Sequence, residues 1–203
     1  MRKTLLPLTF ALAMSAVSAK ADVVYSFIVN TSSLAGTNGY VDFQFNPGVL
    51  STQSATVDIK NFAGATYVAG SQTDVGGASG GPVPGVIAIT NSGIYNDDNE
   101  EVKFGSTLTF TLDFTGPAIN APSGTALSGS SFAFSLFDST DTNPLLTTDP
   151  NGFAAVVNVG TNGSVVTTTP SSAVTIVPEP ASCLMMGLAS LLTLGLCIRK
   201  KQK

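Results

Sequence analysis

Apolar side chains recur at every second position through the middle of the chain, and this period constrains the fold more than any other feature. From Leu108 to Phe114 every second residue is apolar, while the residues between them are threonine or aspartate. The same alternation is found over residues 41–45, 55–59 and 132–136. A period of two places one face of a strand in a core and the other in water, as in antiparallel sheets. The sequence therefore predicts half-buried antiparallel β-strands.

Further strands, and the turns between them, are predicted from the local residue types. Strands are expected where β-branched and aromatic residues cluster, namely at 23–30, 67–68, 86–90, 153–159, 164–168 and 174–177. Turns are expected at Asn-Gly pairs, because both residues tolerate positive φ, namely at 38–39, 151–152 and 162–163. Residues 70–85 and 119–129 predict flexible loops. With no helical period and no tandem repeat, we expect an all-β fold over residues 22–176, an antiparallel β-sandwich that is jelly-roll-like or otherwise Greek key.

The acidic and basic residues of the chain are separated. All thirteen Asp and Glu residues lie between Asp22 and Glu179, where Lys60 and Lys103 are the only basic residues. Nucleic acids and anionic membrane surfaces bind basic patches and repel a region of this charge. We therefore expect no nucleic-acid partner.

The residue types that many enzymes use for catalysis are scarce. The chain has no His and no Trp, and its two cysteines, Cys183 and Cys197, lie in a hydrophobic C-terminal segment. These counts exclude a Ser-His-Asp triad, and they exclude a thiol nucleophile or a Cys/His zinc site in the acidic region. A hydrolase that uses a carboxylate pair is an alternative, although clefts that cleave sugars usually stack aromatic rings on the substrate. The composition predicts a protein that is not an enzyme.

Residues 1–21 have the three parts of a secretory signal peptide. Two basic residues at positions 2 and 3 precede the apolar stretch 5–17, and Ala19 and Ala21 form the small-x-small pattern of a cleavage site. We expect export through the Sec translocon and cleavage by signal peptidase after Ala21. Cleavage after Ala19 and an uncleaved anchor helix are the alternatives.

The C-terminal residues 177–203 have the features of a membrane tail. Residues 181–198 carry no charge, and about 18 apolar residues can span a bilayer core of about 30 Å. A basic end follows, formed by Arg199, Lys200, Lys201 and Lys203. Because such clusters stay in the cytoplasm, the domain that precedes the tail is expected outside the cytoplasmic membrane.

The motif Pro178-Glu179-Pro180 stands directly before this tail. Two prolines around one residue hold the chain extended, so the motif can be read by another protein just above the membrane. The motif, the apolar segment and the basic end together resemble the PEP-CTERM sorting signal of Gram-negative bacteria. This resemblance implies recognition by an exosortase, an integral membrane cysteine protease-transpeptidase, and removal of the tail. A plain C-terminal membrane anchor is the alternative.

The middle of the chain also resembles known proteins. Residues 39–48, 130–138 and 145–153 resemble a family of short PEP-CTERM proteins with no assigned function. Many PEP-CTERM proteins are linked to exopolysaccharide and biofilm matrix. The resemblance therefore implies a membrane-anchored precursor that is delivered to the cell surface or the extracellular space, and it carries no catalytic activity over to this chain.

The densest group of polar side chains lies between Asn96 and Glu101 and predicts a loop. Oxygen ligands grouped on a loop suit Ca²⁺, and Asp97, Asp98 and Glu100 are the candidate ligands. A solvated turn between strands is the alternative. A second acidic segment, residues 138–152, has the Asp, Asn and Gly residues of ordinary turns.

Two functions are therefore open for the exported domain. The first is a non-enzymatic protein of the cell surface or the extracellular matrix. The second is a carbohydrate-binding module, assisted by Ca²⁺ and associated with exopolysaccharide, which rests on an analogy with other jelly-roll sandwiches. The threonines at 107, 109 and 111 lie on one face of a strand, but one such row is ordinary for an exposed strand face and does not predict ice binding.

Overall fold

The structure of the chain is a computed structural model that describes residues 22–49 and 51–179. This part is an all-β fold in which every strand pairing is antiparallel. The strands are β1 (Val23–Asn30), β2 (Asn38–Pro47), β3 (Thr56–Tyr67), β4 (Thr73–Val75), β5 (Ala78–Gly80), β6 (Ile87–Thr90), β7 (Asp97–Thr115), β8 (Ser130–Phe137), β9 (Phe153–Val159), β10 (Val165–Thr168) and β11 (Val174–Pro178). Two short helices, η1 (Ser32–Leu34) and α1 (Pro117–Asn120), follow β1 and β7.

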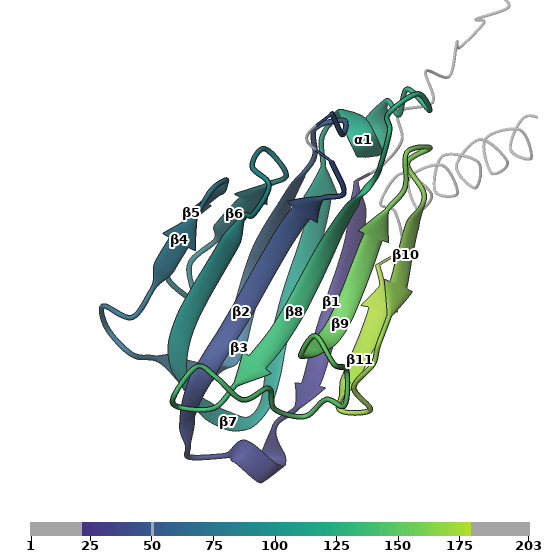
Figure 1. Cartoon of the computed structure of the whole chain (residues 1–203). Coiled ribbons are helices and arrows are strands. Elements are labelled where there is room, and N and C mark those ends of the chain that lie inside the picture. Colours follow the sequence, from purple (N-terminus) through teal and green to yellow (C-terminus); the bar gives the residue numbers. More distant parts are fainter. Residues whose placement is uncertain (1–21, 50, 180–203) are drawn as a thin grey trace, which may run out of the picture.

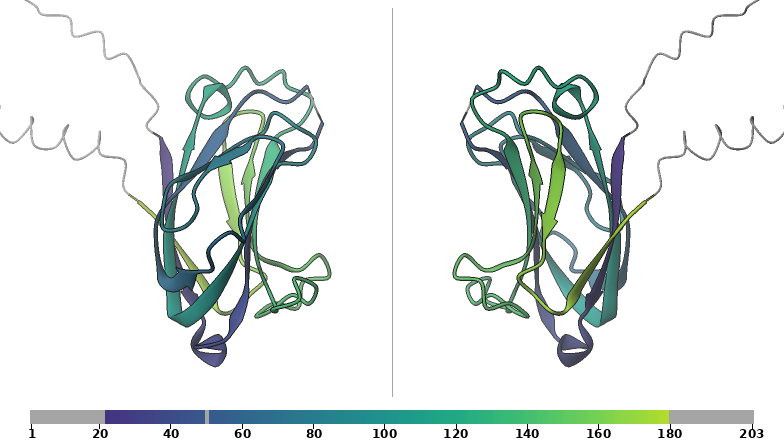
Figure 2. Two further views of the ribbon diagram at one scale, coloured as in Figure 1. Left: turned by 90° about the vertical axis from the view of Figure 1, so that its left-hand side faces the viewer. Right: turned by 90° about the vertical axis from the view of Figure 1, so that its right-hand side faces the viewer.

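All of these strands belong to one sheet, which folds over into two layers. Its main path is β10-β9-β8-β2-β7-β3-β6-β5, and β11 and β1 join through β7. The 19-residue strand β7 serves both layers: residues 97–103 pair with β2, and residues 107–114 pair with β1. Figure 1 shows β7 bending through the bottom of the molecule, and Figure 2 shows the two layers from the side.

Glycines allow β3 and β7 to bend together. The pairing of these two strands shifts register between Lys60 and Ala65. Gly64 has a φ of 91°, and a Cβ at this position would collide with the carbonyl of Thr107. A Cβ at Gly105 would in turn collide with the carbonyl of Gly64. Bulges and bends of this kind are how a strand passes from one layer to the other.

Phenylalanine side chains fill the space between the layers. Phe110 of β7 stacks on Phe27 of the same layer, with ring centroids 4.8 Å apart. Across the core it packs against Phe43 of β2 at 5.4 Å and Phe134 of β8 at 4.9 Å. All four rings are buried, so Phe110 joins both layers through direct contacts.

The segments with a period of two, at 41–45, 55–59, 108–114 and 132–136, correspond to β2, β3, β7 and β8, and most of the strands predicted from local residue types are found as well. Strands at 23–30 and 153–159 are confirmed with the same bounds, and the turns at 151–152 and 162–163 are confirmed by glycines with positive φ. The predicted all-β class with antiparallel strands is confirmed. Residues 181–198, where an apolar helix is predicted, lie outside the described residues. Within the described residues no helix is long and apolar enough to cross a membrane.

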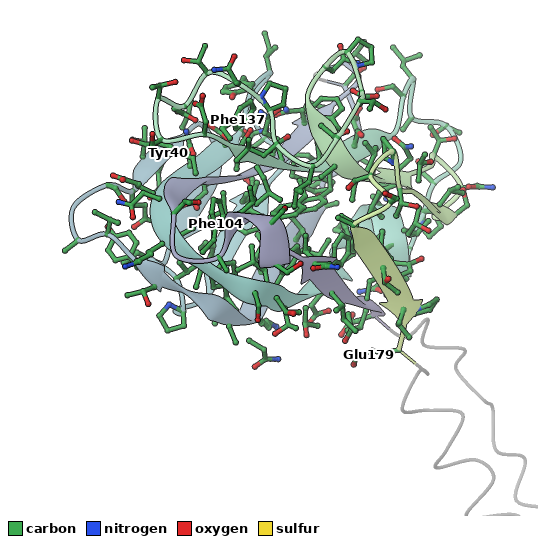
Figure 3. The ribbon with its side chains drawn as sticks, turned by 90° about the horizontal axis from the view of Figure 1, so that it is seen from below. Tyr40, Phe104, Phe137 and Glu179 are labelled. Atoms are coloured by element: carbon green, nitrogen blue, oxygen red, sulfur yellow. The ribbon has the colours of Figure 1, made fainter. Side chains whose placement is uncertain are left out.

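Three local predictions are wrong. Residues 70–85 contain β4, which pairs with β7, and β5, which pairs with β6 at one side of the sheet. Residues 97–101 begin β7 and do not form a loop. Asn38-Gly39 begins β2, where a glycine is needed because a Cβ would strike the carbonyl of Phe137 and the ring of Phe104; both residues are labelled in Figure 3. In each case contacts with distant strands override the local turn signal.

Phe110 provides a test of this core. We expect Phe110→Ala to lower the free energy of unfolding by about 3–5 kcal/mol, because it opens a cavity where four rings meet. Urea unfolding of the full-length protein followed by circular dichroism measures the change. Ile28→Thr is the matched control: this side chain is 44% exposed on β1, so we expect a change within about 0.5 kcal/mol. Equal losses in the two variants would contradict the packing described here.

Candidate functional site

The first half of β7 carries polar side chains on both of its faces. Because successive strand residues point to opposite sides, Asp98 and Glu100 face the core, and Asp97 and Asn99 face outward. The strand therefore divides the predicted Ca²⁺ ligands Asp97, Asp98 and Glu100 into two separate groups. Among the described residues, no three His, Cys, Asp or Glu side chains are placed so that they could hold a metal ion together.

The inner cluster comprises Asp98, Glu100, Asp74 and Gln72, beside the backbone of Val83. Asp98 and Glu100 are completely buried. Both carboxylate oxygens of Glu100 accept the N–H of Val83, at 3.1 and 2.9 Å, and Oδ2 of Asp98 accepts Nε2 of Gln72 at 2.7 Å. Asp98 is also within hydrogen-bonding reach of the carboxyls of Asp74 and Glu100.

Burial raises the pKa of two carboxyls of the inner cluster, those of Asp98 and Glu100. Burial, together with the neighbouring carboxyl of Asp74, raises the pKa of Asp98 to about 8. Burial also raises the pKa of Glu100, although its hydrogen bonds from Val83 and Asp98 act in the opposite direction. A protonated Asp98 can donate a hydrogen bond to a neighbouring carboxylate. Such a bond would stabilise the buried cluster within the folded core.

The outer cluster comprises Asp42 of β2 with Asp97 and Asn99 of β7, flanked by Gln44 and Asp141. Asp42 lies directly opposite Asn99 in the pairing of the two strands, and its carboxyl is within hydrogen-bonding reach of that of Asp97. Asp42 and Asp97 are only 5% and 7% exposed. Oδ2 of Asp42 accepts Nε2 of Gln44 at 2.9 Å, and Nδ2 of Asn99 donates to Oδ2 of Asp141 at 2.7 Å.

The outer cluster holds two neighbouring carboxyls, those of Asp42 and Asp97, away from water. Burial and the adjacent carboxyl of Asp97 raise the pKa of Asp42 to about 9. Tyr95 lies beside the pair, and its hydroxyl accepts Nε2 of Gln44 at 3.3 Å. Burial raises the pKa of Tyr95, and the charges of Asp97 and Asp42 add to this shift. The two ion pairs of the described residues both involve Lys60, which bonds to Asp58 and Asp113, so neither neutralises this cluster.

The acidic segment 138–152 is used for turns, as predicted. Oδ1 of Asp138 accepts the backbone N–H groups of Thr140 and Thr142, at 3.1 and 3.2 Å, and Oδ2 accepts Nδ2 of Asn143 at 2.6 Å. These bonds, the one from Asn143 foremost, hold the pKa of Asp138 well below its usual range. Asp149 likewise accepts the N–H of Asn151 at 2.8 Å. The carboxylates of Asp138 and Asp149 therefore stabilise the turns of this segment.

The predicted sorting motif, Pro178-Glu179-Pro180, begins inside the sheet. Pro178 is the last residue of β11 and lies opposite Tyr25 of β1. The N–H of Glu179 donates to the carbonyl of Val24 at 2.9 Å, and its Oε1 accepts the hydroxyl of Ser26 at 2.5 Å. The sheet thus extends two residues beyond the predicted domain end at 176. The other predicted site residues lie outside the described part of the chain: Ala19, Ala21, Pro180, Arg199, Lys200, Lys201 and Lys203.

Sequence patterns did not reveal the partners of the two clusters. Asp42 was indistinguishable from the polar residues of an exposed strand face, Asn99 lay in the polar segment 96–101 that was predicted to be a loop, and Asp74 lay in a segment predicted to be a flexible loop. The only signal was the unusual density of carboxylates at 97–101. Which residues oppose them depends on the register of β2 and β4 against β7, a long-range property.

A groove of about 440 Å³ lies on the outer face of β2, β8 and β9. Asn46, Ser131 and Asn158 are among its lining residues, and they lie side by side on three neighbouring strands. Asn46 follows Asp42 and Gln44 on the same face of β2. The groove is therefore close to the outer cluster and offers amide and hydroxyl groups.

Comparison with known proteins does not add an identity to this geometry. No family model, no curated protein and no solved structure matches the chain.

The inner cluster makes stability depend on pH. From about pH 4 to about pH 8 the folded protein keeps a proton on Asp98 that the unfolded chain, with a pKa of 3.8, has released. Stability is then highest at the acidic end of this window and falls as the pH rises. Asp98→Asn can still accept from Gln72 and donate to Asp74, and its amide does not ionise. We expect it to remove up to about 1.4 kcal/mol per pH unit of that fall.

Thermal unfolding between pH 4 and pH 9 in EDTA measures the slope. Asp98→Ala serves as the contrast: it also does not ionise, but it removes the acceptor of Gln72 as well, so we expect it to be about 1–3 kcal/mol less stable than Asp98→Asn at every pH. Parallel pH profiles for the wild-type protein and Asp98→Asn would contradict a protonated Asp98.

Proposed function

We propose that this chain is an exported, non-enzymatic protein of the cell surface or extracellular matrix of a Gram-negative bacterium, sorted and processed through a C-terminal PEP-CTERM signal. The observation that carries the proposal is the position of the motif directly at the end of the domain. Pro178 closes β11, and Glu179 is bonded to β1, so no linker separates the domain from the motif. An exosortase, by resemblance, would read this motif and remove the tail.

The arrangement of the two ends suits delivery at a membrane. β1 and β11 are neighbouring antiparallel strands, so the first and last described residues, Asp22 and Glu179, lie at the same end of this pair. Figure 3 places Glu179 at one side of the domain and Tyr40, on the outer face of β2, at the other. With the tail in the membrane, the outer face of β2 would point away from the attachment point and stay available to matrix polymers such as exopolysaccharide.

The proposed lack of catalysis rests on the residues that remain in the domain. Without His or Cys between Asp22 and Glu179, carboxylates are the groups best suited to acid–base chemistry. Asp98 and Glu100 are completely buried, and each is bonded to the protein itself. We also infer a jelly-roll-like or otherwise Greek-key sandwich, supported by the place of β2 between β8 and β7, which are both distant from it in sequence.

A carbohydrate-binding module is the second candidate. The groove beside Asn46, Ser131 and Asn158 favours it, because amide and hydroxyl groups that line a groove can bond to sugar hydroxyls. Binding of the full-length protein to exopolysaccharide from the producing strain distinguishes the two candidates. Saturable binding that Asn158→Ala weakens would support the module, since this side chain is exposed at the groove. Absence of saturable binding would leave the structural role.

Processing of the tail is the direct test of the sorting proposal. In a host with an active exosortase, we expect the intact mass of the surface-delivered protein to lack residues 181–203. Glu179→Ala changes the central residue of the motif, and we expect this variant to keep the full-length C-terminus.

Ser26→Ala is the matched control. It removes the hydroxyl that binds Glu179 and leaves the motif unchanged, so we expect processing as in the wild-type protein. A full-length C-terminus in the wild-type protein would contradict the sorting proposal and would favour a plain membrane anchor.

A further inference from the structure

Three buried oxygen atoms of the outer cluster have no hydrogen-bond donor. They are Oδ1 of Asp42, Oδ1 of Asp97 and Oδ1 of Asn99. All three side chains project from the outward face of β2 and β7, with Asp42 opposite Asn99 and Asp97 two residues before Asn99. A buried acceptor that lacks a partner is costly, and a buried charge costs far more unless it is paired. A bound cation would satisfy these three oxygen atoms and offset the charge of the carboxylates.

Neighbouring side chains orient these oxygens. Gln44 holds Oδ2 of Asp42 through its Nε2, which leaves Oδ1 free. Asp141 accepts a hydrogen bond from Nδ2 of Asn99, so the amide oxygen of Asn99 points away from Asp141. Ligands of metal ions are commonly held by a second layer of hydrogen bonds in this manner.

The inner cluster does not offer a comparable set. Both oxygens of Glu100 accept Val83, and Oδ2 of Asp98 accepts Gln72, so Oδ1 of Asp98 is its one buried oxygen without a donor. Asp113 also has one such oxygen, but its other oxygen bonds to Lys60 at 2.9 Å. Among the described residues, only the outer cluster brings several unpartnered buried oxygens together.

We propose that Asp42, Asp97 and Asn99 form a binding site for one Ca²⁺ ion that bridges β2 and β7. Two carboxylates and one amide oxygen are the hard ligands that Ca²⁺ prefers, and water molecules complete its six to eight ligands. The ligands lie on paired strands, so the ion links β2 to the first half of β7. The site differs from the set Asp97, Asp98 and Glu100 expected from sequence, and it does not depend on the sorting role of the tail.

Calcium titration of the full-length protein in detergent tests the site. For a dissociation constant of about 10⁻⁴ M and about 10 mM CaCl₂, we expect the unfolding midpoint to rise by about 5–10 °C over the value in EDTA. Asp42→Asn and Asp97→Asn each remove one charged ligand at constant size, and we expect both to abolish this rise. Isothermal titration calorimetry with CaCl₂ gives a second readout, which is independent of any change in the stability of the metal-free variant.

Asp98→Asn is the matched control, because it changes a carboxylate on the same strand that faces the core. We expect it to keep the calcium response of the wild-type protein. No calcium response in the wild-type protein would overturn the site and leave a carboxyl pair, Asp42 and Asp97, that shares a proton. Loss of the response in Asp98→Asn with retention in Asp42→Asn would also overturn it, and a response to MgCl₂ larger than that to CaCl₂ would overturn the choice of ion.

Discussion

Phe110 reaches Phe43 and Phe134 because β7 bends between its two halves. The first half pairs with β2 and the second with β1, so one strand belongs to both layers and brings their aromatic faces together. The bend depends on the close approach of β3 and β7 at Gly64 and Gly105, where a side chain would not fit. Every other feature of the domain, including the two acidic clusters, takes its position from this fold of the sheet.

The acidic clusters lie where local strand chemistry and tertiary burial conflict. Residues 97–101 have the polarity of a loop, yet they are held as the first part of a central strand. The sheet then buries Asp98 on its inner face and Asp97 on its outer face. The cost of this burial is offset in three ways: by protonation, by hydrogen bonds from Gln72 and Val83, and by the proposed cation. A protein that retains such groups within its sheet gains sensitivity to its ionic surroundings.

The position of the proposed sorting motif connects the domain with its proposed destination. Because β11 ends at Pro178 and pairs with β1, the proposed attachment point lies at the end of one strand pair. Glu179 is also bonded to Val24 and Ser26, so the domain holds part of the motif that another protein is proposed to read. The groove lies on β2, β8 and β9, and the outer cluster lies on β2 and the first half of β7; both are in the other layer, where a matrix polymer or an ion could reach them.

The amino-acid sequence by itself determined the strand class and many strand bounds. The alternation at 108–114 and the β-branched run at 153–159 are local, so their period could be read directly. It also limited the chemistry, because a domain without His or Cys has no Ser-His-Asp triad, no thiol nucleophile and no Cys/His zinc site. Only the tertiary structure decided that 73–75 and 78–80 are strands, and that the carboxyl of Asp42 on β2 lies within hydrogen-bonding reach of that of Asp97 on β7. These facts depend on register and on contacts between residues far apart in the chain, whose energies no local pattern records.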